Sequence, residues 1–256
     1  MFTIQVVNRS NINRDEVALA VNAINQQLLK HFFPAWQIRV VCKVAPVKLE
    51  LREVDAGAVI FLTNHGRADC QGYHDVVKKT GIPYGFCFVN LLDDEPWSVT
   101  LSHEILELAL NPYCDAYHLS KHPERHEKRH VFLWREAADP VQCQSYPIKI
   151  NRKSVLVSDF VYPNYFTPYS ESIGRNNHLD NISSCSLAEG GYLGFYDPLT
   201  GDDVTFFARD DLKAFKRFDL KAKAGQYRRR TRTSELIRGI RNKRLEDVGA
   251  VLEVSV

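Results

Sequence analysis

The amino-acid sequence predicts an α+β fold followed by a basic C-terminal extension. Two segments, residues 13–32 and 97–110, repeat apolar side chains at helical spacing, whereas the segments between them alternate in polarity or form short apolar runs, as strands do. The 256 residues are 45% hydrophobic and 25% charged, which is typical of a soluble protein with one main core. We therefore expect a domain over residues 1–205 and a separate segment over residues 206–256.

The first predicted helix begins after Asn13, which is spaced from Glu16 as the two residues of a capping pair are. It closes before Pro34. Alternating or apolar runs then predict three strands, over residues 38–44, 47–51 and 58–62, of which the third is central. A loop over residues 65–75 and a fourth strand over residues 84–92 follow.

The second helix, residues 97–110, is predicted to end at Asn111 and is apolar on nearly every side. At 100° per residue, His103, Glu104 and Glu107 fall within one narrow polar sector. A helix this apolar should be buried, and an uncompensated buried carboxylate costs about several kcal/mol. A divalent cation compensates the carboxylates directly, and ion pairs with an Arg are the competing interpretation.

His103 and Glu107 are one turn apart, close enough to bind one ion, while Glu104 can contact a water on that ion. Catalytic zinc usually takes three protein ligands, so a third must come from elsewhere. Glu136 and Asp139 are spaced one turn apart in WREAAD, which we expect to form a short helical stretch. One of them can bind the ion while the other orients His103, although a pair of surface carboxylates is the alternative.

Several stretches carry a resemblance to a known family. They are GYHD, GIPYGFCFV, WSVTLSHEILELALNP, EAAD, VSDFVYPNYF and EGGYLGFYD, and they occur in this order within residues 1–200. The chain resembles a family of zincin-like bacterial and phage proteins, described as metallopeptidases, that share an SHExxE signature. Family members often have Asp where this chain has Asn111 and Cys where it has Ala138, so the chain departs from the family at both positions.

The resemblance implies a zincin-like fold, in which a mixed sheet packs on the active-site helix and its edge strand runs above the metal. Residues 84–92 would then be the edge strand along which an extended peptide binds. The site residues that the resemblance implies are the metal pair His103 and Glu107, the general base Glu104, and an acidic ligand that is Glu136 or Asp139.

Two further groups of residues are candidates for function. Tyr73 and His74 lie in the predicted loop, and either can supply the oxyanion donor that zinc peptidases need, although capping of the loop by His74 is the alternative. Four histidines, at positions 118, 122, 126 and 130, recur among Lys and Arg residues. This setting favours a cationic, solvated loop or helix over a metal site.

The basic segment over residues 213–244 holds thirteen Lys and Arg residues against two acidic ones, a net charge of +11 in a chain of net charge +2. Such a density suits a nucleic-acid backbone or an acidic protein surface, and a solvated tail is the alternative. The sequence shows no signal-peptide pattern, no membrane-spanning apolar run and no CxxC pair. We expect a cytoplasmic protein, phage-encoded or cellular, with reduced cysteines and no membrane contact.

Two functions follow from these patterns. The first is a hydrolase that uses one zinc ion, above all a peptidase with a peptide or protein substrate. A carboxylate in the second ligand position makes the site more negative, which also suits a harder ion than zinc. The second is a catalytically inert zincin-shaped binding or structural module, which the basic tail docks to nucleic acid or to a larger assembly. The position of the third ligand separates the two hypotheses.

Overall fold

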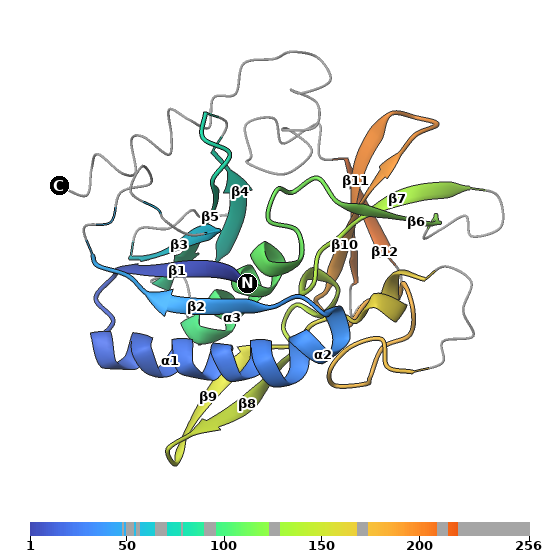
Figure 1. The fold of residues 1–256 in the computed structure, drawn as a ribbon. Coiled ribbons are helices and arrows are strands. Elements are labelled where there is room, and N and C mark those ends of the chain that lie inside the picture. Colours follow the sequence, from blue (N-terminus) through green and yellow to red (C-terminus); the bar gives the residue numbers. More distant parts are fainter. Residues whose placement is uncertain are drawn as a thin grey trace.

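The structure is a computed structural model, and it has the α+β character expected from the sequence (Figure 1). It describes residues 1–47, 49, 54, 57–64, 71–77, 79–89, 96–122, 129–167, 174–208 and 215–219. Within this part of the chain, two sheets and a hairpin surround a small number of helices. No helix in it is long and apolar enough to cross a membrane.

The first sheet is mixed, with the strand order β2-β1-β3-β5-β4. Four strands run parallel to one another, and β4 runs antiparallel to β5 at one edge. The central strand is β3, as predicted, and it is buried along its whole length. The strands of this sheet are β1 (Phe2–Arg9), β2 (Val40–Val44), β3 (Ala58–Thr63), β4 (Gly72–Val76) and β5 (Pro83–Phe88).

Three strand predictions are corrected by this sheet. Strand β5 pairs with β3 on one side and β4 on the other, so residues 84–92 are not the edge strand. The outer strand is β4, which takes up the end of the predicted loop at 65–75 and continues to Val76. Its buried polar residues obscure the alternation of apolar side chains that marks a strand. Val47 and Leu49 lie in no strand, and the remainder of that predicted strand includes residues outside the described part.

The first helix, α1 (Arg14–Gln27), starts at Asn13, whose side chain accepts a hydrogen bond from the backbone of Asp15. The α-helix ends before Pro34, as predicted, but the helical path continues beyond Gln27. A π-helical turn (Leu28–Phe32) leads directly into α2 (Phe33–Trp36), with Pro34 in the first turn of α2. The fixed φ of proline suits the first turn of an α-helix.

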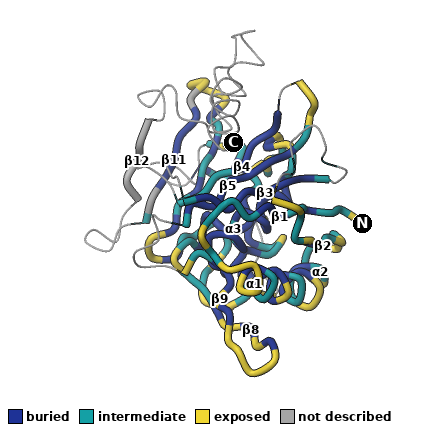
Figure 2. The backbone as a smooth tube through the Cα atoms, turned by 90° about the vertical axis from the view of Figure 1, so that its left-hand side faces the viewer, coloured by how far each residue is buried: buried dark blue, intermediate teal, exposed yellow. Residues whose placement is uncertain are grey.

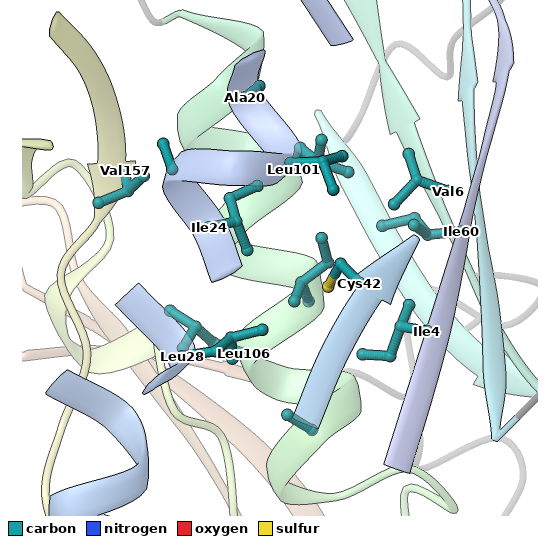
Figure 3. Close-up of a cluster of buried hydrophobic side chains, with 14 of the residues drawn as sticks. Ile4, Val6, Ala20, Ile24, Leu28, Cys42, Ile60, Leu101, Leu106 and Val157 are labelled. Carbon is teal, nitrogen blue, oxygen red and sulfur yellow. The ribbon is translucent and has the colours of Figure 1, made fainter. Parts of the chain in front are cut away.

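Helix α3 (Trp97–Leu110) carries the SHExxE motif and has the predicted bounds. Figure 3 shows its residues Leu101 and Leu106 packed beside α1, with the first sheet on one side and Val157 on the other. Val157 belongs to a hairpin of two strands, β8 (Ser145–Ile150) and β9 (Lys153–Ser158), which projects below α1 in Figure 1. Figure 2 shows the resulting arrangement: α3 is in the interior, and the tip of the hairpin is exposed.

The second sheet is antiparallel and has the strand order β12-β11-β10-β7-β6. The histidine-rich segment forms part of it, which corrects the predicted solvated loop or helix. His118 stacks on Phe166, and His122 is buried against Phe195, while residues 123–128 lie outside the described part. The strands are β6 (Tyr117–Lys121), β7 (His130–Trp134), β10 (Tyr192–Asp197), β11 (Asp202–Ala208) and β12 (Phe215–Asp219).

The predicted division of the chain at residue 205 falls within β11, which pairs with β12. Of the basic segment over 213–244, only the strand β12 belongs to the described residues. The role predicted for this segment in binding nucleic acid or an acidic surface therefore lies outside the described residues almost entirely.

A buried polar network fixes α3 against α1 and β9. The hydroxyl of Ser102 donates to Gln27 Oε1 at 2.7 Å and accepts from the backbone N–H of Ser158 at 3.2 Å. Gln27 in turn donates to the carbonyl of Ser158 at 2.7 Å. Ser102 and Gln27 are fully buried. The serine that precedes His103 in the motif therefore sets the position of the helix.

We expect Ser102→Ala to lower the free energy of unfolding by about 2–6 kcal/mol, because it leaves two buried groups without their hydrogen bonds to Ser102 and each costs about 1–3 kcal/mol. Urea unfolding measures the change. The matched control is Ser186→Ala, which removes an exposed hydrogen bond to Ser183 and should cost less than about 0.5 kcal/mol. Equal losses in the two variants would contradict a structural role for Ser102.

Candidate metal centre

The candidate site lies where the edge strand β4 passes over α3. The side chain of His74 points from β4 toward the polar sector of α3 and reaches Glu104 and Glu107. The close approach requires Gly72, because a Cβ there would lie 2.7 Å from Glu104 Oε1 and 2.9 Å from the carbonyl oxygen of Phe86. The sequence GYH therefore combines a residue without a side chain and a histidine two positions later on the same face of the strand.

An outer donor group consists of His103, Glu107 and Asp139. His103 Nε2 lies 3.4 Å from Glu107 Oε1 and 3.3 Å from Asp139 Oδ1. Neighbouring ligands of a tetrahedral zinc with bonds of 2.0–2.1 Å lie about 3.3 Å apart, so both separations fit. One N–H of the ring can align with only one of the two carboxylates, whereas a cation between the three groups contacts all of them. These donors also lie within 4.8 Å of one another.

An inner donor group consists of His74, Glu104 and Glu107. His74 Nδ1 lies 3.1 Å from Glu104 Oε2 and 3.3 Å from Glu107 Oε2. The two groups share Glu107, which presents one carboxylate oxygen to each histidine. The inner group is also the deeper: its side chains are 3–6% exposed, whereas His103 is 13% and Asp139 9% exposed.

The loop that follows β7 delivers Asp139. The backbone N–H groups of Ala138 and Asp139 approach Glu107 Oε1 at 3.4 and 3.3 Å, which places the loop against α3. Asp139 then begins a 3-10 turn (Asp139–Val141). Gly191 allows β10 to start beside this turn, since a Cβ at Gly191 would collide with the carbonyl oxygen of Pro140. The strand β4, the helix α3 and the loop after β7 are distant in sequence, and all three place polar groups against Glu107.

The two acidic residues that are candidates for the third ligand, Glu136 and Asp139, face different histidines. Asp139 faces His103, whereas Glu136 Oε2 lies 3.8 Å from His74 Nε2. The predicted short helical stretch is wrong, because Glu136 precedes the 3-10 turn and lies in no helix. The prediction that one of the two carboxylates orients His103 through its second ring nitrogen is also wrong, since Asp139 shares Nε2 with Glu107 and Glu136 faces His74.

Tyr73 does not join the site. Its ring packs against Tyr84, Phe86 and Phe88 at centroid distances of 5.3–6.3 Å, on the face of the sheet opposite to His74. Neighbouring residues of a strand point to opposite faces, so Tyr73 and His74 cannot both face α3. The geometry thus provides no support for Tyr73 as an oxyanion donor.

The two departures from the family have local explanations. Asn111 ends α3, and its side-chain oxygen accepts from the backbone N–H groups of Asp115 and Ala116, each at 3.1 Å. It shapes the loop and is not part of either donor group. Ala138 is fully buried, and its N–H faces Glu107, so the position contributes backbone to the site.

Two residues of the site were missed by the sequence analysis. The side chain of Tyr192 lies beside Asp139 and lowers its pKa, and that of Cys114 lies beside His74 and raises its pKa. Tyr192 belongs to the EGGYLGFYD stretch, whose paired glycines are a signal of close backbone approach. Cys114 has a positive φ of 50° in the loop after α3, and nothing in its sequence surroundings indicates a contact with residue 74.

Both histidines of the site are basic. Burial lowers the pKa of His74, but the side chains of Cys114, Glu104 and Glu107 outweigh it and raise the pKa to about 10. Burial likewise lowers the pKa of His103, and Glu107 and Asp139 raise it well above the ordinary value. Burial and the charge of Glu107 raise the pKa of Asp139. The folded protein without metal therefore holds protons in this cluster that the unfolded chain releases.

This difference gives an expected pH dependence. A raised histidine pKa stabilises the fold fully below the unfolded value of about 6.5, and the contribution is lost as pH rises toward the folded pKa of about 10 for His74. The raised pKa of Asp139 acts in the same direction at lower pH. Zinc must displace these protons, so its stabilising effect grows with pH. We expect the Tm with chelator to fall from pH 6.5 to 8.5, while the increase in Tm from zinc becomes larger.

Thermal unfolding at a series of pH values, with and without zinc, measures both trends. His74→Gln should make the chelated protein less sensitive to pH. A Tm with chelator that rises over this window, or a zinc effect that is constant across it, would contradict the assignment of protons to these histidines.

Comparisons with protein-family models, with curated proteins and with solved structures found no match to this chain.

Proposed function

We propose that the protein is a metal-dependent hydrolase that cleaves peptide bonds, with zinc held by the outer donor group. The observation that carries the proposal is the position of His103 Nε2 between the carboxylates of Glu107 and Asp139, at 3.4 and 3.3 Å. The resemblance of the sequence to zincin-like proteins supports the same reading. A bound zinc ion would supply a Lewis acid and lower the pKa of a coordinated water toward neutrality.

The exposure of the site suits a substrate that approaches from the side of His103 and Asp139, whose side chains are more exposed than those of the inner group. Asp139 is held by the side chain of Tyr192 and by the placement of its own backbone against Glu107. These contacts keep the third ligand in position before an ion binds, which lowers the cost of ordering it.

Glu104 is the general base in this proposal. It follows His103 on α3, and its Oε2 is held by His74 Nδ1 at 3.1 Å. Glu104 takes a proton from the attacking water and passes it to the leaving nitrogen as the bond between carbonyl carbon and nitrogen breaks. His74 is a positioning residue for Glu104, because its Nδ1 faces carboxylates and not the exposed side of the site.

An extended substrate would pair with β4, the outer strand of the first sheet among the described strands. This placement replaces the one expected for residues 84–92. It would bring the substrate backbone alongside Gly72 and His74, next to the polar sector of α3.

Cleavage of a peptide library by the full chain tests the function. The purified protein is loaded with one equivalent of zinc and incubated with peptides from a digested proteome, and new amino termini are identified by mass spectrometry. We expect new termini with zinc, none after a chelator, and their return when zinc is added again.

His118→Ala is the matched control, because His118 is a hydrogen-bonded histidine outside both donor groups and its loss should leave cleavage intact. His103→Ala should abolish cleavage. Absence of new termini from the zinc-loaded protein, or equal cleavage by His103→Ala, would reject the proposed function.

A further inference from the structure

Glu107 is placed to serve two ions. Its Oε1 lies 3.4 Å from His103 Nε2, and its Oε2 lies 3.3 Å from His74 Nδ1. The two histidines come from different elements, β4 and α3, so the two oxygens of one carboxylate face two separate nitrogen donors. Carboxylates bridge in this manner in two-metal sites, where the ions lie about 3.5–4 Å apart.

The inner group has the donor spacing that a cation requires. His74 Nδ1 lies 3.1 Å from Glu104 Oε2 and 3.3 Å from Glu107 Oε2, close to the spacing of about 3.3 Å between tetrahedral ligands. As in the outer group, one ring nitrogen faces two carboxylates and one N–H can align with only one of them. The inner group therefore repeats the donor spacing of the outer group, with Glu107 common to both.

A second observation comes from the far side of the His74 ring. Its Nε2 is buried and makes no hydrogen bond within the described part of the chain, although Glu136 Oε2 lies 3.8 Å away. Metal-binding histidines usually direct the second ring nitrogen to a carboxylate, and Glu136 is positioned for that role. Gly72 leaves room for this arrangement, because a Cβ there would push against the Glu104 carboxylate.

We infer that His74, Glu104 and Glu107 form a second divalent-cation site, bridged to the first through Glu107. The ion would be zinc or a similar transition metal, since an imidazole is among its donors. It binds after the first and at least about tenfold more weakly, because two dications repel each other at this separation and share one carboxylate.

The second ion has a consequence for Glu104, which rests on the function proposed above. A carboxylate that binds a cation no longer accepts a proton from water, so filling the inner site removes the general base. The protein with one ion is then the active form, and excess zinc switches it off. Binding of the second ion does not depend on the protein being a hydrolase.

Native mass spectrometry of the full chain in a zinc titration tests the inference. We expect one zinc ion per chain at low free zinc and two at higher free zinc. His74→Phe should retain the first ion and weaken the second by at least about 100-fold, since even an outer-shell loss costs about 10–100-fold. Glu104→Gln, whose neutral amide is a poorer ligand, gives the same test if His74→Phe fails to fold. His118→Ala controls for binding to other histidines and should still take up two ions.

The outcomes separate the two proposals. A single ion at every zinc concentration would overturn the second site and leave the proposed hydrolase intact, and no bound ion would overturn both. Two ions in His74→Phe would place the second one elsewhere and reject the inference. Two ions in the wild type together with cleavage that increases on filling the second site would contradict the inhibitory role.

Discussion

Glu104→Gln is expected to reduce hydrolysis by at least about 10²–10⁴-fold, the range that general acid–base catalysis contributes. The amide keeps the size of the side chain but cannot accept a proton from water. At one equivalent of zinc the outer group should still hold its ion, because Glu104 belongs only to the inner group. The expected result is therefore a protein that binds its first ion but does not cleave peptides, measured by zinc content and peptide cleavage on the same sample.

Glu16→Gln is the matched control for this substitution. Glu16 is exposed in the first turn of α1 and belongs to neither donor group, so the same chemical change should leave cleavage unchanged. Turnover in Glu104→Gln within a few-fold of the wild type would show that Glu104 is not the base, even if zinc is bound as expected.

Loss of Glu107 is expected to have the largest effect on metal binding, because this carboxylate belongs to both donor groups. Glu107→Ala should weaken the first ion by more than about 100-fold, given that loss of an outer-shell contact alone costs about 10–100-fold. It should also eliminate the second ion. His103→Ala, by contrast, should remove only the outer ion, since His103 takes no part in the inner group.

The stability of the Glu107 variants must be measured separately from their zinc binding. Glu107 also accepts from the backbone N–H groups of Ala138 and Asp139, so its loss disturbs the loop that carries the third ligand. Glu107→Gln retains an acceptor for these contacts and should fold at least as well as Glu107→Ala. Undiminished uptake of both ions by Glu107→Gln would contradict its role as the shared ligand.

The α3 helix could be predicted from sequence because its signals are local. Apolar residues surround three polar ones at fixed angles, and the helix ends at Asn111 as predicted. The edge strand could not be predicted in this manner. In β4 the residues that face the interior include His74, which is buried against Glu104 and Glu107, and the expected alternation of apolar side chains is absent. This buried polar contact removes the pattern by which the strand would be recognised.

Likewise, the sequence predicts with certainty of position only those candidate site residues that lie on the one helix α3. His103, Glu104 and Glu107 follow from helical geometry, and Asp139 was one of two acidic candidates. The separation of Asp139 from Glu136 depends on the 3-10 turn after β7, and the contacts of Tyr192 and Cys114 depend on how β10 and the loop after α3 pack. Such contacts join segments far apart in the chain, and spacing in sequence carries no information about them.

The central claim is that the outer group binds a metal ion, and the zinc content of the purified full chain tests it most directly. The protein is dialysed against buffered free zinc in the nanomolar range, and zinc per chain is measured for the wild type, His103→Ala and His118→Ala. We predict one zinc ion in the wild type and in His118→Ala, and none in His103→Ala. A wild-type chain that binds no zinc, or a His103→Ala chain that binds as much as the wild type, would contradict the claim.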